Sequence, residues 1–355
     1  MSKYLLGAVS VLAVLALLIL VPTSPALLVD MPETIFSIPT GGVDVYGDPA
    51  SLVVTVYGLC IALGTTLAIG LTAYLNRKTI GVTGGMALAL VSGVFALICS
   101  HLSFCAVRWS YIINDLGGSA AYLWQFWQGG YTMYGAILGA LLGVVIFAKA
   151  RKAAVLPLLD TLVPGIALVV ALGRFGEKFT LQGMGSYVAN EALAMLPFVT
   201  TNEWGEAQVM VFAYEALFAA IALIASLAVL ARKSPVGRAA ETGLAVISLA
   251  QVILDSWRGD ELIRFGFVRL NMICAAVVLA VIIGTRIARV VKKQGWKAWP
   301  IIRAVLFLAS AGIVIAIEFA LDKSTINNTL LYAVMALTLV MMGVCTLTDD
   351  GRQAA

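Results

Sequence analysis

The chain has 355 residues, of which 61% are hydrophobic and only 12% are charged, and its formal net charge is +4. Soluble globular domains are about 25% charged and about half apolar, so this composition excludes an ordinary soluble enzyme or binding domain. The mean hydropathy of +0.99 indicates instead a chain that lies mostly within a lipid bilayer.

Apolar segments of membrane-spanning length follow one another along the sequence. A bilayer core is about 30 Å thick, so a spanning helix needs about 20 mostly apolar residues. Ten segments meet this requirement: 4–22, 52–75, 83–105, 132–149, 155–172, 208–230, 239–255, 268–287, 301–321 and 329–346. Because open sheets and irregular chain cannot face lipid, we predict an all-α polytopic membrane protein with about ten transmembrane helices.

The first of these segments allows two interpretations. Lys3 precedes an apolar run that ends near PTSPALL (22–28), as in a secretory signal peptide. The run is long for the apolar core of a signal peptide, and the residues after it make a poor cleavage site. We therefore favour an uncleaved transmembrane helix.

Lysine and arginine residues gather in alternate loops, the pattern that marks the cytoplasmic side of a membrane protein. Sixteen of the 23 lie on one side: Lys3, Arg77, Lys78, Lys149, Arg151, Lys152, Arg232, Lys233, Arg238, Arg286, Arg289, Lys292, Lys293, Lys297, Arg303 and Arg352. The other seven lie on the opposite side with most of the acidic residues: Arg108, Arg174, Lys178, Arg258, Arg264, Arg269 and Lys323. We predict that both termini are cytoplasmic and that the smaller set faces outward.

Two outward loops, 106–131 and 173–207, are long enough to carry functional residues. The second begins with GRFGEKFTLQGMG (173–185), which places Arg174 and Glu177 where an apolar segment should leave the membrane. Charges at this depth are costly unless they are paired or functional. An arginine fork matches the phosphate oxygens that a phospholipid headgroup offers. The alternative is that each outward arginine snorkels to the surface or pairs with a nearby acid.

The cysteines and the single histidine give weaker signals. The five cysteines form no CxxC pair, so neither a disulfide framework nor a metal site is indicated. His101 lies in the middle of a predicted helix, and a core histidine bonded to a neighbouring carbonyl explains it best.

Several stretches together resemble one family, the bacterial prolipoprotein diacylglyceryl transferases. The family hallmark is close to G-R-x-G-N-F-x-N-x-E-x-x-G, of which this chain keeps Gly173, Arg174, Gly176 and Gly185. Further similar stretches occur in the right order: IFSI (35–38), VYGL (56–59), RWSY (108–111), WQGGYTMYGAILG (127–139), LLDTLVPGIALVVALGR (158–174), YEAL (214–217) and VILDSWRGD (252–260). The likeness covers about 30–290 and implies a core of seven helices.

The chain departs from the family pattern at polar positions. Tyr134 stands where the family has a histidine, Glu177 where the hallmark has its first asparagine, and Gln182 where it has a glutamate. Without gaps, a tyrosine and an arginine of the family's sixth core helix fall on Ile247 and Gln251. These departures put an unaltered family mechanism in doubt.

The resemblance implies transfer of diacylglycerol from phosphatidylglycerol to the lipobox cysteine of a prolipoprotein, with glycerol phosphate as the leaving group. Fixed cations should meet the departing phosphate, a base should take the thiol proton, and helices near the outer leaflet should exclude water. The implied location is the plasma membrane of a bacterium, which the chain would cross several times. The implied partners are phosphatidylglycerol, the signal peptide of the prolipoprotein and the bilayer, and we expect no cofactor, metal or nucleic acid.

Three residues are candidates for catalytic roles. Arg174 would bind the phosphate, and Glu177 would take the thiol proton. Tyr134 occupies the histidine position but is a poor base, because an unperturbed tyrosine has a pKa of about 10. The alternative for Glu177 is a simple ion pair with Arg174 or Lys178.

The substrate-binding candidates are Arg108, Gln182, Gly185, Tyr214, Gln251, Asp255 and Arg258. Structural roles are open for several of them. Arg258 could pair with Asp255 or Asp260, and the Tyr214–Glu215 pair could orient a loop or a partner arginine. Gln251 could join Asp255 one helical turn away in a structural network. The glycines of the hallmark could serve close helix packing.

The sequence therefore divides into an extra N-terminal transmembrane helix (1–29), a seven-helix core (30–290), and a basic cytoplasmic loop with a C-terminal transmembrane hairpin (291–355). Three functions stay open: an active transferase with rearranged acid–base groups, a relative acting on another lipid or acceptor, and a non-catalytic phospholipid-binding or transport protein. Complementation of a transferase-depleted cell and an uptake assay in proteoliposomes would separate them.

Overall fold

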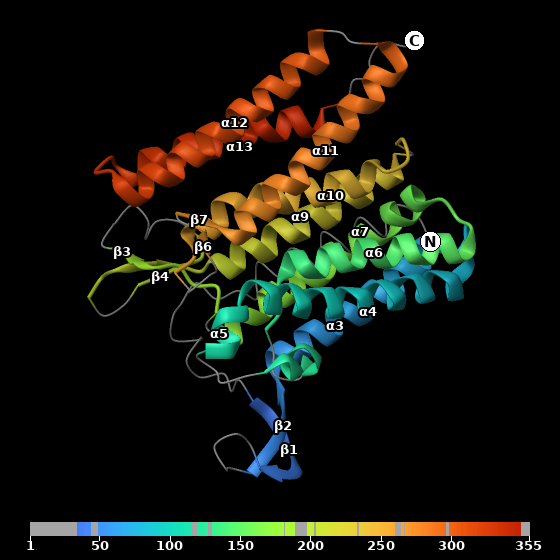
Figure 1. The fold of residues 1–355 in the computed structure, drawn as a ribbon, viewed down its shortest axis with the longest axis vertical. Helices are drawn as coiled ribbons and strands as arrows, with labels where there is room; N and C mark the ends of the chain where they lie inside the picture. The colour runs from blue at the N-terminus through green and yellow to red at the C-terminus, as the bar shows by residue number, and fades with distance from the viewer. Residues whose placement is uncertain are drawn as a thin grey trace.

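The computed structural model describes residues 34–43, 49–114, 119–126, 130–180, 182–188, 197–201, 204–232, 234–259, 264–265, 267–295 and 298–348. Within these residues, nine helices are long and apolar enough to cross a membrane. They are α3 (Val56–Asn76), α4 (Gly81–Val107), α6 (Met133–Arg151), α7 (Val155–Gly176), α9 (Val211–Ala231), α10 (Arg238–Trp257), α11 (Leu270–Gln294), α12 (Ala298–Lys323) and α13 (Asn328–Leu347). They run side by side as one bundle (Figure 1).

Nine of the ten predicted spans correspond to these helices, and the first, 4–22, lies outside the described residues. The largest difference is at α11, which continues to Gln294 although the apolar segment was predicted to end at 287. Residues 288–294 include lysine and arginine, which are good helix formers, so the helix continues beyond the predicted apolar segment.

Short helices and short strands lie outside the nine long helices. The all-α prediction did not include the strands. The short helices are α5 (Trp109–Asn114), η1 (Ala120–Trp124) and η3 (Glu177–Phe179). Strand β1 (Thr34–Val43) pairs antiparallel with β2 (Pro49–Thr55), β5 (Ala207–Val209) lies between β3 (Tyr187–Val188) and β4 (Val199–Thr201), and β6 (Arg264–Phe265) pairs with β7 (Val268–Arg269). Strand β2 occupies the start of the predicted span 52–75, and Thr55 then caps α3 by accepting a hydrogen bond from the Gly58 amide at 3.0 Å.

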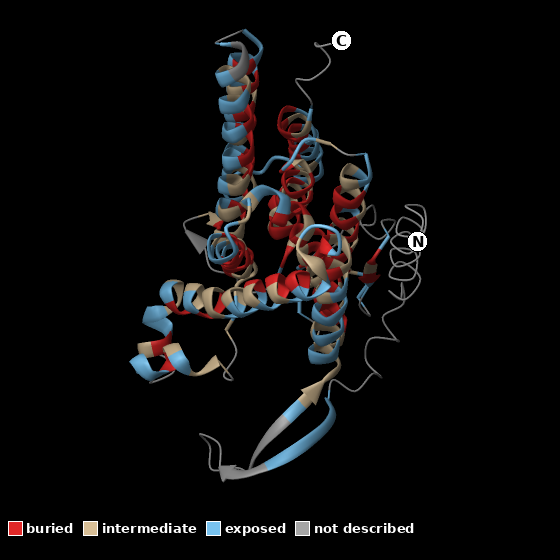
Figure 2. Ribbon diagram, turned by 90° about the vertical axis from the view of Figure 1, so that its right-hand side faces the viewer, coloured by how far each residue is buried: buried red, intermediate tan, exposed pale blue. Residues whose placement is uncertain are grey.

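Small residues bring the helices into close contact, as is usual in a membrane where apolar side chains alone give no driving force. On α6, a Cβ at Gly139 would lie 2.2 Å from the Phe95 carbonyl oxygen, and one at Gly143 would lie 2.6 Å from Ser92 Cα. The backbones of α4 and α6 therefore touch at these points. Buried residues face the interior of the bundle, and exposed residues face outward (Figure 2). Many of the exposed residues on the helices are large and apolar.

A carboxylate ties α7 to the start of α10. Asp160 accepts hydrogen bonds from the backbone amides of Gly237 at 2.6 Å and Ala240 at 2.9 Å. These amides belong to the first turn of α10, which has no intrahelical acceptors and favours a negative charge. The contact fixes these two helices relative to each other, and both lead to residues of the candidate site.

Candidate functional site

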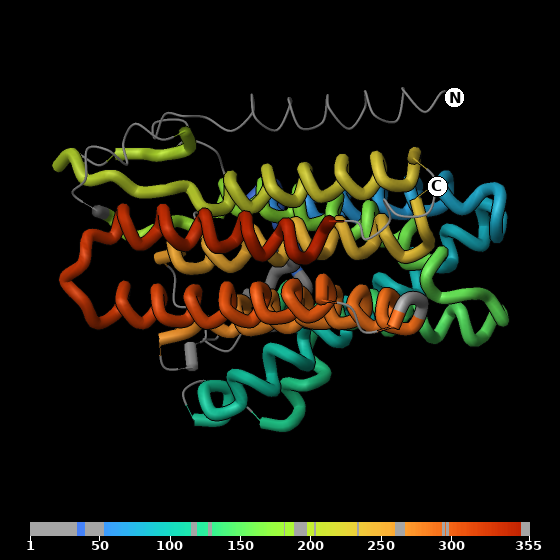
Figure 3. The backbone as a smooth tube through the Cα atoms, turned by 90° about the horizontal axis from the view of Figure 1, so that it is seen from above, coloured from blue at the N-terminus to red at the C-terminus, as the bar shows by residue number. Residues whose placement is uncertain are grey.

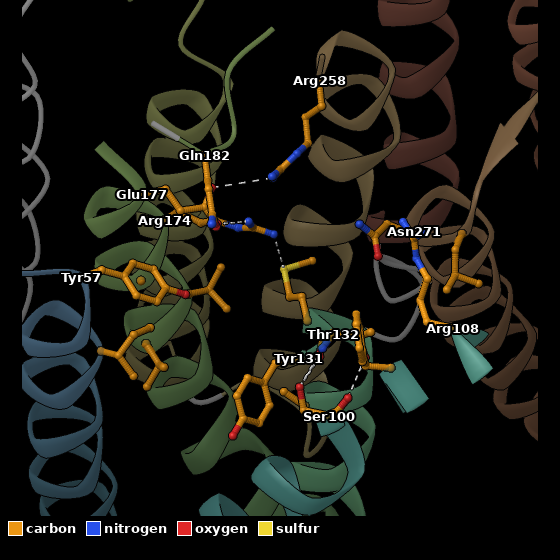
Figure 4. A pocket seen from close by; sticks show the side chains of 18 residues that line it. Tyr57, Ser100, Arg108, Tyr131, Thr132, Arg174, Glu177, Gln182, Arg258 and Asn271 are labelled. Atoms are coloured by element: carbon orange, nitrogen blue, oxygen red, sulfur yellow. Dashed lines mark hydrogen bonds and ion pairs between the residues drawn. The ribbon is translucent and has the colours of Figure 1, made fainter. Parts of the chain in front are cut away.

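A cavity of about 440 Å³ lies at the end of the bundle that carries α5 and the short strands. Its lining comes from α3, α4, α6, α7 and α11, and from the segments that follow α4, α7 and α10. Arg174, Glu177, Gln182 and Arg258 lie on one side of it, and Arg108 and Asn271 lie across from them (Figure 4).

Arg174 lies in the last turn of α7, so the helix itself places the guanidinium at the cavity. One nitrogen, Nη1, forms an ion pair with Glu177 Oε1. Nε lies 3.3 Å from Glu215 Oε2, and Nη2 lies 3.6 Å from the sulfur of Met133. The side chain is 13% exposed, which leaves it partly accessible from the cavity.

Arg258 directly follows α10 and is held by its backbone. Its amide donates to the Asp255 carbonyl at 3.2 Å, and its carbonyl accepts from Arg269 Nη2 at 2.5 Å. An isolated β-bridge joins Arg258 to Gly185. The side chain, 6% exposed, places Nη1 3.0 Å from Glu215 Oε2 and 3.8 Å from Glu177 Oε2.

Glu215, on α9, connects the two arginines from behind the cavity. The same oxygen, Oε2, receives Arg174 Nε and Arg258 Nη1. The other oxygen, Oε1, accepts a hydrogen bond of 2.8 Å from Gln251 Nε2. With its side chain only 2% exposed, Glu215 is a buried counter-ion and not a surface acid.

Glu177 lies between the same two arginines but on the cavity side. Gly183, which has a φ of +69°, passes so close that a Cβ there would lie 2.4 Å from Glu177 Oε2. Within the described residues, this oxygen is buried and has no hydrogen-bond donor. Glu177 therefore contacts the two guanidinium groups at a position where an anion from the cavity would also bind.

Gln251 and Asp255 extend the polar network away from the cavity. Gln251 Nε2 donates to Glu215 and also to Asp255 Oδ1, at 2.7 Å. Asn271, which does line the cavity, lies 3.4 Å from Asp255 Oδ1 through its amide nitrogen. The sequence predicts a structural network for Gln251 and Asp255. Through these hydrogen bonds, the two residues connect α10 to α9 and to the start of α11.

The structure places five of the ten predicted site residues on the described cavity lining: Arg108, Arg174, Glu177, Gln182 and Arg258. Tyr134 is not on that lining, because Met133 at the start of α6 faces the cavity and the next residue turns towards α10 and α11. The Tyr134 side chain is buried there, with its hydroxyl 3.5 Å from Ser248 Oγ.

Gly185 and Tyr214 also lie away from the described lining. The Gly185 amide donates to the carbonyl of Val209, at the end of β5, at 2.7 Å. Gly185 therefore links β5 to Arg258, with which it forms the isolated β-bridge. The Tyr214 hydroxyl donates to the Pro197 carbonyl, and its ring packs edge-on against Trp257. Of the two acids predicted to pair with Arg258, Asp260 lies outside the described residues. Asp255 accepts from the Arg258 amide through its backbone carbonyl, and the Arg258 side chain pairs with Glu177 and Glu215.

Close packing accounts for two of the hallmark glycines. A Cβ at Gly173 would lie 2.7 Å from Ile61 Cδ1, and one at Gly176 would lie 3.0 Å from Cys60 Cβ, so both positions bring α7 against α3. His101 is fully buried, with Nδ1 3.1 Å from the Gly130 carbonyl and Nε2 3.0 Å from the Tyr122 carbonyl. The prediction of a core histidine bonded to a carbonyl is confirmed.

Several lining residues were not chosen from the sequence. Tyr57 reaches the cavity from the first turn of α3, and the similarity of VYGL to a family segment could have pointed to it. Asn271 follows an apolar start of α11 and carries no motif. Ser100 of α4 and Thr132, just before α6, also line the cavity. Ser100 Oγ donates to the Thr132 carbonyl at 2.7 Å, which holds the start of α6 against α4.

The arrangement suits a phosphate group. Two guanidinium groups converge from separate elements, and each is matched by a carboxylate, so the cluster of Arg174, Arg258, Glu177 and Glu215 is balanced when all four are charged. A buried set of this kind is costly unless both charges and hydrogen bonds are satisfied. An incoming phosphate can replace one carboxylate without leaving the arginines unpaired.

Comparison with known proteins gives one family. The family described as prolipoprotein diacylglyceryl transferase matches residues 44–290. A phosphatidylglycerol–prolipoprotein diacylglyceryl transferase of Clostridium novyi is 29% identical over 143 residues, which are 40% of this chain and 54% of that protein. The proteins of the same name from Ligilactobacillus salivarius and Geobacillus kaustophilus are 30% and 25% identical over 36% and 68% of this chain, and over 47% and 91% of their own lengths. The chain thus spans about half the length of the first two relatives.

Proposed function

The chain belongs to the prolipoprotein diacylglyceryl transferase family, and from this premise we propose that it transfers a diacylglyceryl group from phosphatidylglycerol to the lipobox cysteine of a prolipoprotein. The reaction would take place at the outer leaflet of a bacterial plasma membrane, as a step of lipoprotein biosynthesis. The observation that carries the proposal is the pair of converging arginines, Arg174 and Arg258, at a cavity within the matched region.

The proposed reaction needs one bond to form and one to break. The cysteine sulfur attacks the carbon of the diacylglycerol unit that carries the phosphate. The bond between this carbon and the phosphate oxygen breaks. Glycerol phosphate leaves with the electron pair, while the thiol proton passes to a base. Negative charge therefore grows on the leaving phosphate, where fixed cations in a site shielded from water are most effective.

Arg174 and Arg258 are the proposed phosphate ligands. Their guanidinium groups share Glu215 Oε2 at 3.3 and 3.0 Å, so the buried glutamate fixes both at once. Groups that are already oriented lose little freedom when the transition state forms. Arg108, across the cavity, and Gln182, beside Glu177, are the proposed contacts for the remaining polar parts of the headgroup.

Glu177 is the proposed base, and its position suggests how headgroup binding could activate it. Its carboxylate pairs with Arg174, and Oε2 lies 3.8 Å from Arg258 Nη1. A phosphate that takes over these arginines displaces the carboxylate, which then lacks the cations that stabilise its charged form. A carboxylate in such a desolvated position binds a proton more readily, so the thiol would be deprotonated once the lipid is in place.

Release of glycerol phosphate tests the proposal directly. We expect the purified chain, in vesicles containing phosphatidylglycerol, to release glycerol phosphate when a lipobox peptide is added. The same peptide with serine in place of cysteine is the substrate control, and Arg174→Gln is the protein control. If the folded protein binds phosphatidylglycerol but releases no glycerol phosphate, this reaction is contradicted. The result would then favour the alternative that the chain acts on another acceptor.

A further inference from the structure

The C-terminal hairpin of α12 and α13 lies outside the region 44–290 that matches the family, yet it is packed into the bundle. It runs along α10 and α11 (Figures 1 and 3). Met335 is fully buried and belongs to one apolar cluster with Val252 of α10 and Met272 of α11. The hairpin is therefore part of the same core as the helices that carry the site.

The end of the hairpin furthest from the cavity is fixed by arginines. Arg303 Nε donates to the Cys345 carbonyl at 3.0 Å, Arg238 Nη2 donates to the Leu347 carbonyl at 3.0 Å, and Arg286 Nη1 donates to the Thr346 carbonyl. These carbonyls are in the last turn of α13, where basic side chains satisfy groups that have no intrahelical donor. The three arginines come from three different helices, so α13 cannot slide along the bundle without losing several bonds.

At the cavity end, Tyr332 of α13 contacts the last residues of α10. Its hydroxyl lies 3.3 Å from Ser256 Oγ, and its ring lies edge-on to Trp257, with ring centres 5.8 Å apart at 80°. Tyr214 of α9 packs against Trp257 in the same manner, at 5.9 Å and 80°. The Trp257 ring is thus held by one tyrosine from the core and one from the hairpin.

Trp257 is the last residue of α10, and the next residue is the cavity arginine Arg258. The chain beyond it is held by the Gly259 amide, which donates to the Met184 carbonyl at 2.7 Å. The last turn of α10 leads directly into Arg258, and the packing of Trp257 is one of the contacts that hold this turn.

We propose that Tyr332 is a positioning residue for Arg258, and that the hairpin thereby forms part of the lipid site. The inference rests on the proposed function in one respect, namely that Arg258 binds the headgroup phosphate. Edge-on aromatic pairs have a preferred geometry, so the Tyr332 ring holds Trp257 in one orientation. Small displacements of a binding group have large effects on a site that needs defined geometry.

The experiment is a double-mutant cycle on the full chain, with equilibrium binding of short-chain phosphatidylglycerol as the readout. We expect Tyr332→Leu to weaken binding about tenfold. Tyr332→Phe keeps the ring and should stay within about twofold of the wild type, as should Trp299→Leu. Trp299 is a matched control because it is 52% exposed and lies at the other end of the hairpin. In an Arg258→Gln background, Tyr332→Leu should weaken binding further by less than about twofold, because the group that it positions is gone.

An equal loss in both backgrounds, or no loss in Tyr332→Leu, would overturn the inference. If Tyr332→Leu does not fold, Tyr332→Met serves the same cycle, since its flexible thioether fills space without a ring edge. A wild-type chain that binds no phosphatidylglycerol would remove the proposed function and this inference together. A wild-type chain that binds the lipid but shows additive effects would remove only the positioning role.

Discussion

At the residue scale, Glu215 is the buried counter-ion that the two arginines of the described site share. Its Oε2 is the common partner of Arg174 and Arg258, and its side chain is 2% exposed. Removal of one member of a buried ion pair leaves an uncompensated charge and costs about 3–5 kcal/mol. We therefore expect Glu215→Gln to lower the thermal unfolding midpoint of the purified protein strongly.

The control for this change is Asp322→Asn, because Asp322 has a half-exposed side chain that pairs with Lys323 at 3.1 Å. Exposed pairs contribute about 0–1 kcal/mol, so the midpoint of this variant should stay close to that of the wild type. Equal midpoints for the two variants would show that Glu215 is not the shared counter-ion that the distances indicate.

Glu177→Gln separates the two roles that the sequence left open for this residue. If Glu177 takes the thiol proton, the amide removes a general base, which typically costs about 10²–10⁴-fold in turnover. Affinity for phosphatidylglycerol should be unchanged or higher, because the amide competes less with phosphate for Arg174. Turnover and lipid binding measured on the same preparation test this prediction, and a variant that turns over normally would leave Glu177 as an ion-pair partner alone.

Sequence reasoning found the arginines of the site because charge at membrane depth is rare enough to be noticed. It allowed the Tyr214–Glu215 pair to orient a partner arginine, but it did not show which arginines Glu215 contacts. Arg258 and Glu215 are 43 positions apart, and their 3.0 Å contact depends on how α9 and α10 pack. The motif position favours Tyr134, yet its neighbour Met133 faces the cavity and Tyr134 packs into the core. Asn271 carried no signal, since its role arises only from the cavity that forms around it.

At the element scale, hydropathy predicted nine helices in the described residues, because length and apolar composition are what a bilayer requires. It could not predict β2, whose apolar residues continue into α3 without a change in hydropathy, so that the cap at Thr55 marks the boundary. It also could not show which helices pack together. That information lies in small residues such as Gly139, which have meaning only when the partner helix is known.

Glycine contacts between α4 and α6 give a paired prediction of opposite sign. A Cβ at Gly139 would lie 2.2 Å from the Phe95 carbonyl oxygen, whereas a Cβ at Gly93 on α4 would meet nothing within 4 Å. Gly139→Ala should destabilise the protein by about 1–3 kcal/mol through overpacking. Gly93→Ala should stabilise it by up to about 1 kcal/mol through helix propensity. Thermal unfolding in detergent checks both, and the same shift for the two variants would contradict the close α4–α6 contact.

At the scale of the whole molecule, α5 and the short strands lie towards one end of the bundle (Figure 1). The polar residues of the cavity belong to that end, and the arginines that bind the α13 carbonyls belong to the other. The division of lysines and arginines in the sequence predicts that the first end is external. The proposed function requires this orientation, because it places the acceptor thiol at the outer leaflet. A site that faced the cytoplasm could not reach this acceptor.

Single cysteines at the two ends test that orientation. Ser324 lies in the exposed turn between α12 and α13, and Val236 is 53% exposed in the chain before α10. In a background with the five native cysteines replaced, we expect Ser324→Cys to react with a membrane-impermeant maleimide on intact cells. Val236→Cys should react only after the membrane is opened, because basic residues keep its loop in the cytoplasm. The reverse pattern would place Arg174 and Arg258 at the inner leaflet, where they could still bind a phospholipid but could not serve a thiol outside the cell.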